Sequence, residues 1–342
     1  MNKFEVVFYP YGNKQIGSSR VRVYKLDKYL NELGIHTCII NNYEFLKKLN
    51  SIQDIFVLNL LDKRILRNYI INKLSNKEIS ISNKIFFFQK RGYNDLNLIK
   101  YIKEKNGKIV FDIVDEYDNK YINVIKNSNI VTTASEPMRI FLESKFENMD
   151  VKVIDQYIDY IDKPYPNRMH EKYDDLKIVF FSNPRNLQDI SLCLEPLKKL
   201  AKKKKYFFSY ICGERHDDIF KGLKVNYIKW EYHTYSSNLK KFDLAIAPQS
   251  DNLKPRSKVV EAITHNLPII SSNIHSYREL AKNTNTTEFI CNNQKEWYYA
   301  LDTMLDPETR NEYLRKTQQW VWKYHGKKFL TNKWLSMFNE LF

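Results

Sequence analysis

Three basic residues stand close together where the sequence predicts the start of a helix. Residues 254–261 read KPRSKVVE, and Pro255 suits a first helical turn because its missing N–H is not needed there. Arg256 and Lys258 put positive charge at this helix N-terminus, where the helix dipole disfavours it. A bound anion would offset this unfavourable placement of charge, and free backbone N–H groups and two cations would hold it. The spacing therefore predicts a phosphate site that includes Arg256, Ser257 and Lys258.

A carboxylate follows these cations by one helical turn. Glu261 lies three residues after Lys258 and so shares its face of the helix. A carboxylate beside a phosphate site can accept hydrogen bonds from ribose hydroxyls. The combination is typical of a site for a nucleotide diphosphate.

Apolar runs and helical patterns alternate through the chain and must position this motif. We expect strands at 4–9, 36–40, 54–58, 85–88, 108–113, 129–133 and 151–154, and then at 177–181, 206–212, 225–230, 242–248 and 268–271. Continuous apolar strands separated by helices, such as one expected at 63–74, indicate parallel sheets covered on both faces. The predicted fold class is α/β, with two Rossmann-like doubly wound domains. Ligands of such sheets bind at the carboxyl ends of the strands.

The length of 342 residues fits two domains of ordinary size. We place the first at 1–160 and the second at 177–315. Residues 161–176 carry two prolines, mixed charges and no clear period, as a linker would. Residues 316–342 are expected to be helical and to pack back on the first domain through large apolar anchors such as Trp334.

Two other loops could contact the same anion. The loop PYGNKQIGSS after the first strand leads into a helix and offers Gly17, Ser18 and Arg20, with Arg22 also expected to point toward the ligand edge. It lacks the GxGxxG spacing of a dinucleotide site, and ordinary capping with solvated arginines explains it almost as well. The loop SNPRN of the second domain offers Asn183 and Arg185 at another helix start, with a solvated turn arginine as the alternative.

Four carboxylates lie within seven positions after the strand at 108–113, in the segment FDIVDEYD. Asp115 is the candidate for binding sugar hydroxyls or acting as a general base. The acidic start of a helix is the alternative, and it accounts for Glu116 and Asp118. The pattern does not indicate a metal site, because no histidines or second acidic pair complete a coordination sphere. Elsewhere, Ser276 and Glu279 match a Ser-x-x-Glu capping box.

The composition favours anionic partners. Lys and Arg number 55 against 40 Asp and Glu, a formal charge of +15. Such a charge favours a phosphorylated donor, an anionic membrane surface or nucleic acid as a partner. The alternative is that the protein is simply rich in lysines whose side chains are solvated.

The four cysteines are far apart in sequence, which indicates neither disulfides nor zinc and suggests a reducing compartment. With no run approaching roughly 20 apolar residues, we expect a cytoplasmic protein, at most peripheral on the inner face of a membrane.

The order of these elements resembles that of the GT-B glycosyltransferases, in particular family 4 and the loosely related "group 1" enzymes. The segment FDLAIAPQSDNLKPRSKVVEAITHNLPIISS is similar to their pattern of apolar strand, acidic loop, basic helix start, Glu-Ala, Gly-x-Pro and apolar strand. The resemblance implies two domains facing across a cleft. The first would hold the acceptor and the second the nucleotide sugar.

The resemblance also implies roles for single residues. Glu261 would bind the ribose hydroxyls, and Arg185, Arg256 and Lys258 would bind the diphosphate, with the loop from Gly17 to Arg20 closing over it. The chain departs from the family pattern at Leu253, which stands where the first glutamate of the Glu-x7-Glu motif would be. Asp251 or backbone groups would have to substitute for that carboxylate. Asn266 replaces the usual glycine.

These points predict a hexosyltransferase that moves a sugar from a UDP- or GDP-type donor to a hydroxyl of a glycan, a lipid-linked acceptor or a polymer. The resemblance implies retention of configuration and no metal, and we assign catalytic roles to Asp115, Arg185 and Lys258. The alternatives are a GT-B epimerase or phosphorylase, a non-catalytic nucleotide-binding partner subunit, and a glycosyltransferase acting on modified nucleic acid.

Overall fold

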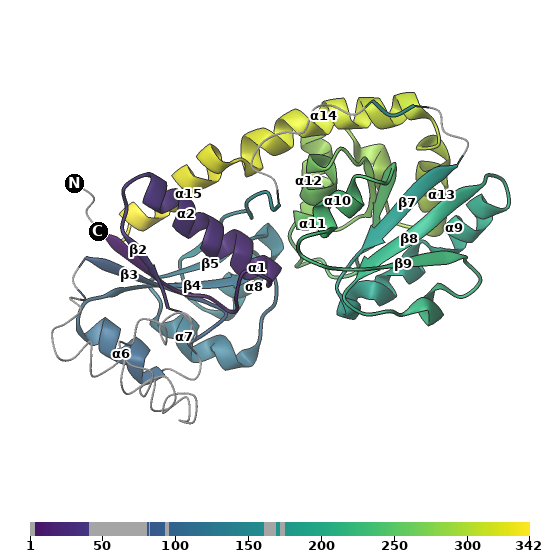
Figure 1. Cartoon of the computed structure of the whole chain (residues 1–342). Helices are drawn as coiled ribbons and strands as arrows, with labels where there is room; N and C mark the ends of the chain where they lie inside the picture. Colours follow the sequence, from purple (N-terminus) through teal and green to yellow (C-terminus); the bar gives the residue numbers. More distant parts are fainter. Residues whose placement is uncertain (1–3, 41–80, 82, 93–95, 161–168, 172–174) are drawn as a thin grey trace, which may run out of the picture. The chain divides into compact units, whose positions relative to one another are not determined.

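The computed structural model describes residues 4–40, 81, 83–92, 96–160, 169–171 and 175–342 (Figure 1). Its contacts divide the chain into two compact units. Unit 1 comprises Met1–Tyr157 and Leu330–Phe342, and unit 2 comprises Ile158–Phe329. The strand expected at 54–58, the helix expected at 63–74 and most of the linker expected at 161–176 lie outside the described residues.

Unit 1 is built on a parallel sheet with the strand order β2-β1-β3-β4-β5-β6. Its strands are β1 (Glu5–Tyr9), β2 (Thr37–Ile39), β3 (Lys84–Gln89), β4 (Lys108–Val114), β5 (Ile130–Thr133) and β6 (Val151–Val153). Its helical segments are α1 (Gly17–Ser19), the π-helical η1 (Arg20–Tyr24), α2 (Lys25–Glu32), α6 (Leu96–Glu104), the 3-10 turn η2 (Asn119–Tyr121), α7 (Ile122–Asn127) and α8 (Glu136–Lys145). Strands β3 and β4 are buried almost throughout, which explains their unbroken apolar sequences.

Unit 2 repeats the plan with the strand order β12-β11-β10-β7-β8-β9, again with parallel pairing. Its strands are β7 (Leu176–Phe181), β8 (Tyr206–Cys212), β9 (Val225–Lys229), β10 (Leu244–Ala247), β11 (Ile269–Ser272) and β12 (Ile290–Cys291). Its helices are η3 (Pro184–Leu192), α9 (Leu194–Ala201), η4 (Asp217–Phe220), α10 (Tyr235–Leu239), α11 (Ser257–Thr264), α12 (His275–Thr284), η5 (Thr287–Phe289), α13 (Gln294–Thr303) and α14 (Pro307–His325). In this unit α9 and α13 lie on one face of the sheet, and α11 and α12 on the other (Figure 1).

Local signals in the sequence set several helix ends. Ser135 caps α8 by accepting a hydrogen bond from the Met138 amide. Gly34, with φ 76°, ends α2, and Asn266, with φ 59°, takes the left-handed position after α11. The helix predicted to start near Pro255 starts at Ser257.

The C-terminal residues belong to unit 1. Helix α15 (Lys327–Asn339) buries Trp334 completely, with its ring 5.5 Å from that of Phe87 in β3. Phe338 packs edge-on against Phe4. The tail from Leu330 onward therefore belongs to unit 1, whereas residues 316–329, which the sequence assigned to the same tail, belong to unit 2.

Candidate functional site

Three neighbouring strands of unit 2 end beside the helix with the basic start. Strands β7, β10 and β11 pair in the order β11-β10-β7, so the loops that follow them share one edge of the sheet. Loop 182–183 follows β7, loop 248–256 follows β10 and leads into α11, and loop 273–274 follows β11. The topology thus brings the predicted segments SNPRN and KPRSK to one place.

Lys258 joins two of these segments directly. Its Nζ donates a hydrogen bond to Ser182 Oγ at 3.1 Å and lies 5.6 Å from the ring centre of Phe180. Burial lowers the pKa of Lys258 to about 8, against the opposing effect of the Asp189 carboxylate. An ammonium disfavoured by burial gains from a second anion, which fits the predicted phosphate site.

The pKa of Lys258 also predicts a pH-dependent stability. It is about 8 in the folded chain against 10.5 for an exposed lysine, so between these values the unfolded chain binds the extra proton. We expect the free energy of unfolding of the wild type, relative to that of Lys258→Met, to rise between about pH 7 and about pH 10. Urea unfolding of both proteins at the two pH values measures this difference. An unchanged difference would contradict the lowered pKa.

A buried carboxylate that the sequence reasoning missed holds the loop after β10. Asp189, 5% exposed, accepts hydrogen bonds from Ser250 Oγ at 2.6 Å and Gln249 Nε2 at 3.1 Å. The backbone N–H of Gln249 in turn donates to Ser272 Oγ at 2.8 Å. Asp189 therefore fixes the strand-end loops around Lys258. The only sign of this role in the sequence is that Asp189 lies in an otherwise apolar helical segment.

Arg256 has a carboxylate partner within unit 2, and this corrects one prediction. Its Nη2 donates to Glu279 Oε2 at 2.6 Å, and its guanidinium lies 5.6 Å from the ring centre of Trp320. The predicted capping box of Ser276 and Glu279 is wrong, because α12 begins at His275 and Glu279 pairs with the arginine instead. Asn252 Oδ1 accepts from the His275 amide at 2.7 Å, so a loop residue satisfies this helix start.

Glu261 lies on α11 beside an aromatic cluster. Burial, helped by the Glu261 carboxylate, raises the pKa of Tyr235 well above its usual value. Tyr160 and Tyr235 have ring centres 4.9 Å apart, and Tyr160 also packs on Tyr232 at 5.7 Å. The predicted ribose-binding carboxylate thus borders a cluster of packed tyrosines in which Tyr235 is buried.

The remaining candidates of unit 2 lie in the surrounding loops. Asp251 Oδ1 accepts from the Leu253 amide at 2.9 Å and so shapes the turn before α11. Asn183 and Arg185 are exposed at the start of η3, and Ser257 is half-buried in the first turn of α11. All four lie at the same sheet edge as Lys258.

The candidates of unit 1 gather at the corresponding edge of its own sheet. Arg20 Nη1 donates to the carbonyls of Lys14 and Gln15, and a Cβ added to Gly17 would lie 3.7 Å from Arg20 Nη2. The Ser18 carbonyl accepts from Gln89 Nε2 at 2.9 Å. This loop is therefore tied to the end of β3.

Arg22 does not point toward the ligand edge, contrary to the prediction. It is completely buried, and its guanidinium pairs with the equally buried Asp112 at 2.5 Å. It also donates to the carbonyls of Ile154 and Asp155. The π-helical turn places Arg22 inside the unit, because the usual 3.6-residue period no longer describes which side chains face outward.

The acidic segment after β4 separates into different roles. Asp112 pairs with Arg22, and Asp118 Oδ1 accepts from the Lys120 amide at 3.0 Å as the cap of η2. Asp115 Oδ1 lies 2.6 Å from Lys90 Nζ. Asp115, with its side chain 29% exposed, stays the candidate of this segment for binding an acceptor.

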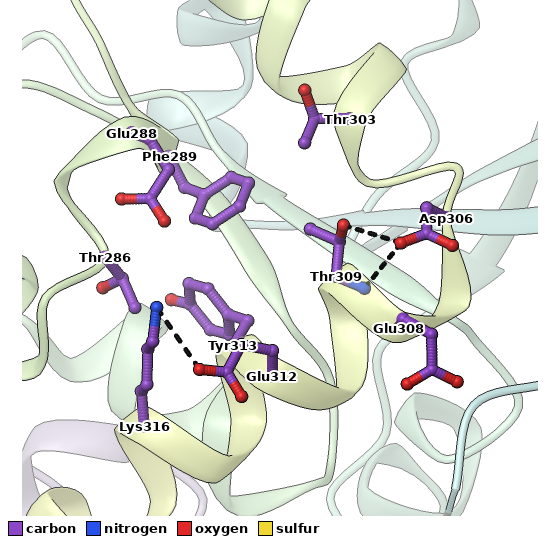
Figure 2. A pocket seen from close by; sticks show the side chains of 10 residues that line it. All are labelled: Thr286, Glu288, Phe289, Thr303, Asp306, Glu308, Thr309, Glu312, Tyr313 and Lys316. Carbon is purple, nitrogen blue, oxygen red and sulfur yellow. Dashed lines mark hydrogen bonds and ion pairs between the residues drawn. The ribbon is translucent and has the colours of Figure 1, made fainter.

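A pocket of about 410 Å³ elsewhere in unit 2 contains none of the predicted site residues (Figure 2). Four of its ten lining residues carry carboxylates, but Asp306 caps α14 by accepting from Thr309, and Glu312 pairs with Lys316. Across the described ranges, no three His, Cys, Asp or Glu side chains are grouped where a metal ion could bind. None of the helices that the structure describes has the length and apolar character to cross a membrane.

Solved structures of other proteins share this fold. A glycosyltransferase from Rickettsia africae ESF-5 matches with a TM-score of 0.70 and 17% identity over 100% of this chain and 99% of its own. HepE from Anabaena, solved in complex with UDP, matches with a TM-score of 0.68 and 11% identity over 98% of this chain and 100% of its own. A mutant of TarM from S. aureus, solved with fondaparinux, α-GlcNAc-glycerol and UDP, matches with a TM-score of 0.63 and 18% identity over 80% of this chain and 58% of its own. No family model and no curated protein sequence matches the chain.

These similarities establish the fold. The chain has the GT-B architecture, with two Rossmann-like domains, as its sequence predicted. At such low sequence identities a shared fold does not show a shared activity.

Proposed function

We propose that the protein is a glycosyltransferase that binds a nucleotide diphosphate sugar at the strand ends of unit 2. The observation that carries this proposal is the hydrogen bond between Lys258 Nζ and Ser182 Oγ, which brings a half-buried cation to the shared edge of β7 and β10 at the start of α11. The UDP in the HepE and TarM complexes supports a uridine nucleotide. A UDP-type donor is therefore the first to test.

The chemistry of transfer explains why cations are needed. The bond between the sugar C1 and the phosphate oxygen breaks, and C1 bonds to the acceptor oxygen, while the acceptor proton passes to a phosphate oxygen of the leaving UDP. Lys258, Arg185 and the backbone N–H groups at the start of α11 would stabilise the charge that grows on the diphosphate. This pathway retains the sugar configuration and needs no metal, and both features are part of the proposal. Asp115 would bind the acceptor hydroxyl on unit 1.

Glu261 gives the proposal a specific test, because its assigned partner is the ribose. We expect the wild type to bind UDP about tenfold more tightly than 2′-deoxy-UDP, since a hydrogen bond to a charged group contributes about 1.5–3 kcal/mol. In Glu261→Met, which removes the acceptor oxygens, this preference should largely disappear, while the affinity for 2′-deoxy-UDP stays close to that of the wild type. Isothermal titration calorimetry with both nucleotides measures the four affinities. A preference that survives in Glu261→Met would remove Glu261 from the ribose site.

A second candidate function is a partner subunit that binds the nucleotide without turnover. Leu253 supplies no carboxylate for the donor sugar, and Asp251, the nearest substitute, accepts a hydrogen bond from the Leu253 amide. Such a protein would be stabilised by UDP in a thermal melt, yet it would release no UDP from any nucleotide sugar. UDP release in the presence of polyol acceptors decides between the two functions.

A further inference from the structure

Two residues at neighbouring strand ends of unit 1 adopt a left-handed backbone. Lys90, just after β3, has φ 47°, and Val114, the last residue of β4, has φ 61°. Residues other than glycine rarely take this conformation, and a β-branched residue such as valine is the least suited to it. Strained residues of this kind persist only where the surroundings hold them, and they cluster at functional sites.

The surroundings of Val114 hold its backbone firmly. The Asp115 amide donates to the Ile113 carbonyl at 2.9 Å, which closes a tight turn with Val114 at its centre. The Val114 carbonyl accepts from Thr133 Oγ1 at 3.0 Å and from the Ala134 amide at 3.2 Å. The pairing of β4 with β5 shifts register at this point. Strand β4 therefore turns sharply just before Asp115.

The two turns bring one cation and one carboxylate together. The Lys90 amide donates to the Asp112 carbonyl at 3.0 Å, so the turn after β3 is tied to β4. Lys90 Nζ then lies 2.6 Å from Asp115 Oδ1, with the lysine side chain 11% exposed and the aspartate side chain 29% exposed. The lysine thus lies beneath the carboxylate, which keeps an accessible side.

The residue before Lys90 connects this pair to the loop that carries the other candidates of unit 1. Gln89 is completely buried and accepts hydrogen bonds from Ser19 Oγ at 2.8 Å and the Tyr11 amide at 3.2 Å. Its Nε2 donates to the Ser18 carbonyl at 2.9 Å. Polar groups of the loop after β1, of α1 and of the end of β3 are therefore fixed around the same strand edge.

Stability alone does not account for this arrangement. A partly exposed ion pair contributes about 0–1 kcal/mol. Each strained backbone residue costs about 1–3 kcal/mol. The strain of the two turns therefore destabilises the fold by more than the ion pair stabilises it. Such a net cost is expected of residues kept for a function.

We propose that Lys90 is the positioning residue of an acceptor site whose binding group is Asp115. The ammonium holds one carboxylate oxygen of Asp115, and the other oxygen accepts a hydrogen bond from the attacking hydroxyl. A carboxylate in this role fits an uncharged polyol or sugar hydroxyl and disfavours a phosphorylated acceptor. This inference rests on the proposed glycosyltransferase function, and it concerns unit 1 rather than the nucleotide site.

The test compares Lys90→Met, Lys90→Arg and Asp115→Asn with the wild type in the full chain. UDP release is measured from UDP-glucose and UDP-N-acetylglucosamine with glycerol and methyl α-glucoside as acceptors, and UDP affinity is measured by calorimetry. Lys84→Met is the matched control, because Lys84 forms an ion pair with Glu5 at the opposite end of the same strand.

We expect Lys90→Met and Asp115→Asn to lower kcat at least about tenfold, because each loses one oriented charge-assisted hydrogen bond. The dissociation constant of UDP should stay within about twofold of the wild-type value. Lys90→Arg should keep most of the activity, and Lys84→Met should behave as the wild type. A folded Lys90→Met with wild-type kcat would overturn the inference, and so would a loss of UDP affinity that accounts for the whole effect. If Lys90→Met does not fold, Asp115→Asn with full activity overturns it equally. A wild type that neither binds UDP nor releases it refutes the proposed function itself.

Discussion

Replacing Lys258 with methionine is expected to weaken UDP binding by about 10- to 100-fold at pH 7. The loss corresponds to one charge-assisted hydrogen bond, worth about 1.5–3 kcal/mol. Methionine keeps most of the side-chain volume beside Phe180, so the change removes the charge rather than the packing. Calorimetric titration with UDP and with uridine measures the effect. Uridine, which has no phosphate, should bind both proteins alike.

The pKa of Lys258 sharpens this prediction. Because that pKa is about 8, the wild type should lose much of its advantage over Lys258→Met above about pH 9. Lys258→Arg should keep its affinity for UDP across this range, since an arginine stays charged. Lys198→Met is the matched control, because Lys198 forms an exposed pair with Glu195 on α9. Equal UDP affinities of wild type and Lys258→Met at pH 7 would show that the diphosphate binds elsewhere.

Replacing Arg22 with methionine is expected to destabilise unit 1 by about 3–5 kcal/mol. The change leaves Asp112 as a buried charge without its arginine, and breaking a buried pair by removing one partner has an effect of this size. The carbonyls of Ile154 and Asp155 also lose their donor, and Trp334 loses the guanidinium 4.8 Å from its ring centre. Urea unfolding followed by circular dichroism measures the loss.

A second substitution separates charge from packing in this pair. Arg22→Met combined with Asp112→Leu removes both charges and should recover part of the lost stability. Arg139→Met is the control, because the pairs of Arg139 with Glu136 and Glu143 lie on the exposed face of α8. It should leave the unfolding midpoint nearly unchanged. An Arg22→Met protein as stable as the wild type would mean that the buried pair contributes nothing to the fold.

Parts of the fold and of the site follow from local chemistry and could be predicted. The runs at 85–88 and 108–113 are apolar because both faces of their strands are buried, so the sequence reveals parallel strands without any knowledge of their partners. The cluster at Arg256 and Lys258 was visible because it conflicts with a helix dipole. Local signals of this kind depend only on neighbours in the sequence.

Other parts depend on contacts between residues far apart in the chain. Arg20 and Arg22 look alike in sequence and both are buried in a π-helical turn, yet Arg20 donates to carbonyls of its own loop and Arg22 pairs with Asp112. The pairing of Arg256 with Glu279 stands in place of the capping box that the local Ser-x-x-Glu pattern wrongly predicted. Lys90 carries no motif at all. Its role arises from a turn that brings it to Asp115, 25 positions away.

The return of α15 to unit 1 has a consequence for how the chain folds as it is made. Phe87, in the middle of a strand of unit 1, packs against Trp334, which emerges from the ribosome only after all of unit 2. Unit 2 is one continuous segment, so its fold needs no residue beyond Phe329. Unit 1, although begun first, must wait with part of its apolar core uncovered until the last helix arrives. The order of synthesis and the order of completion are thus reversed, and the early half of the chain is the one that depends on protection from aggregation.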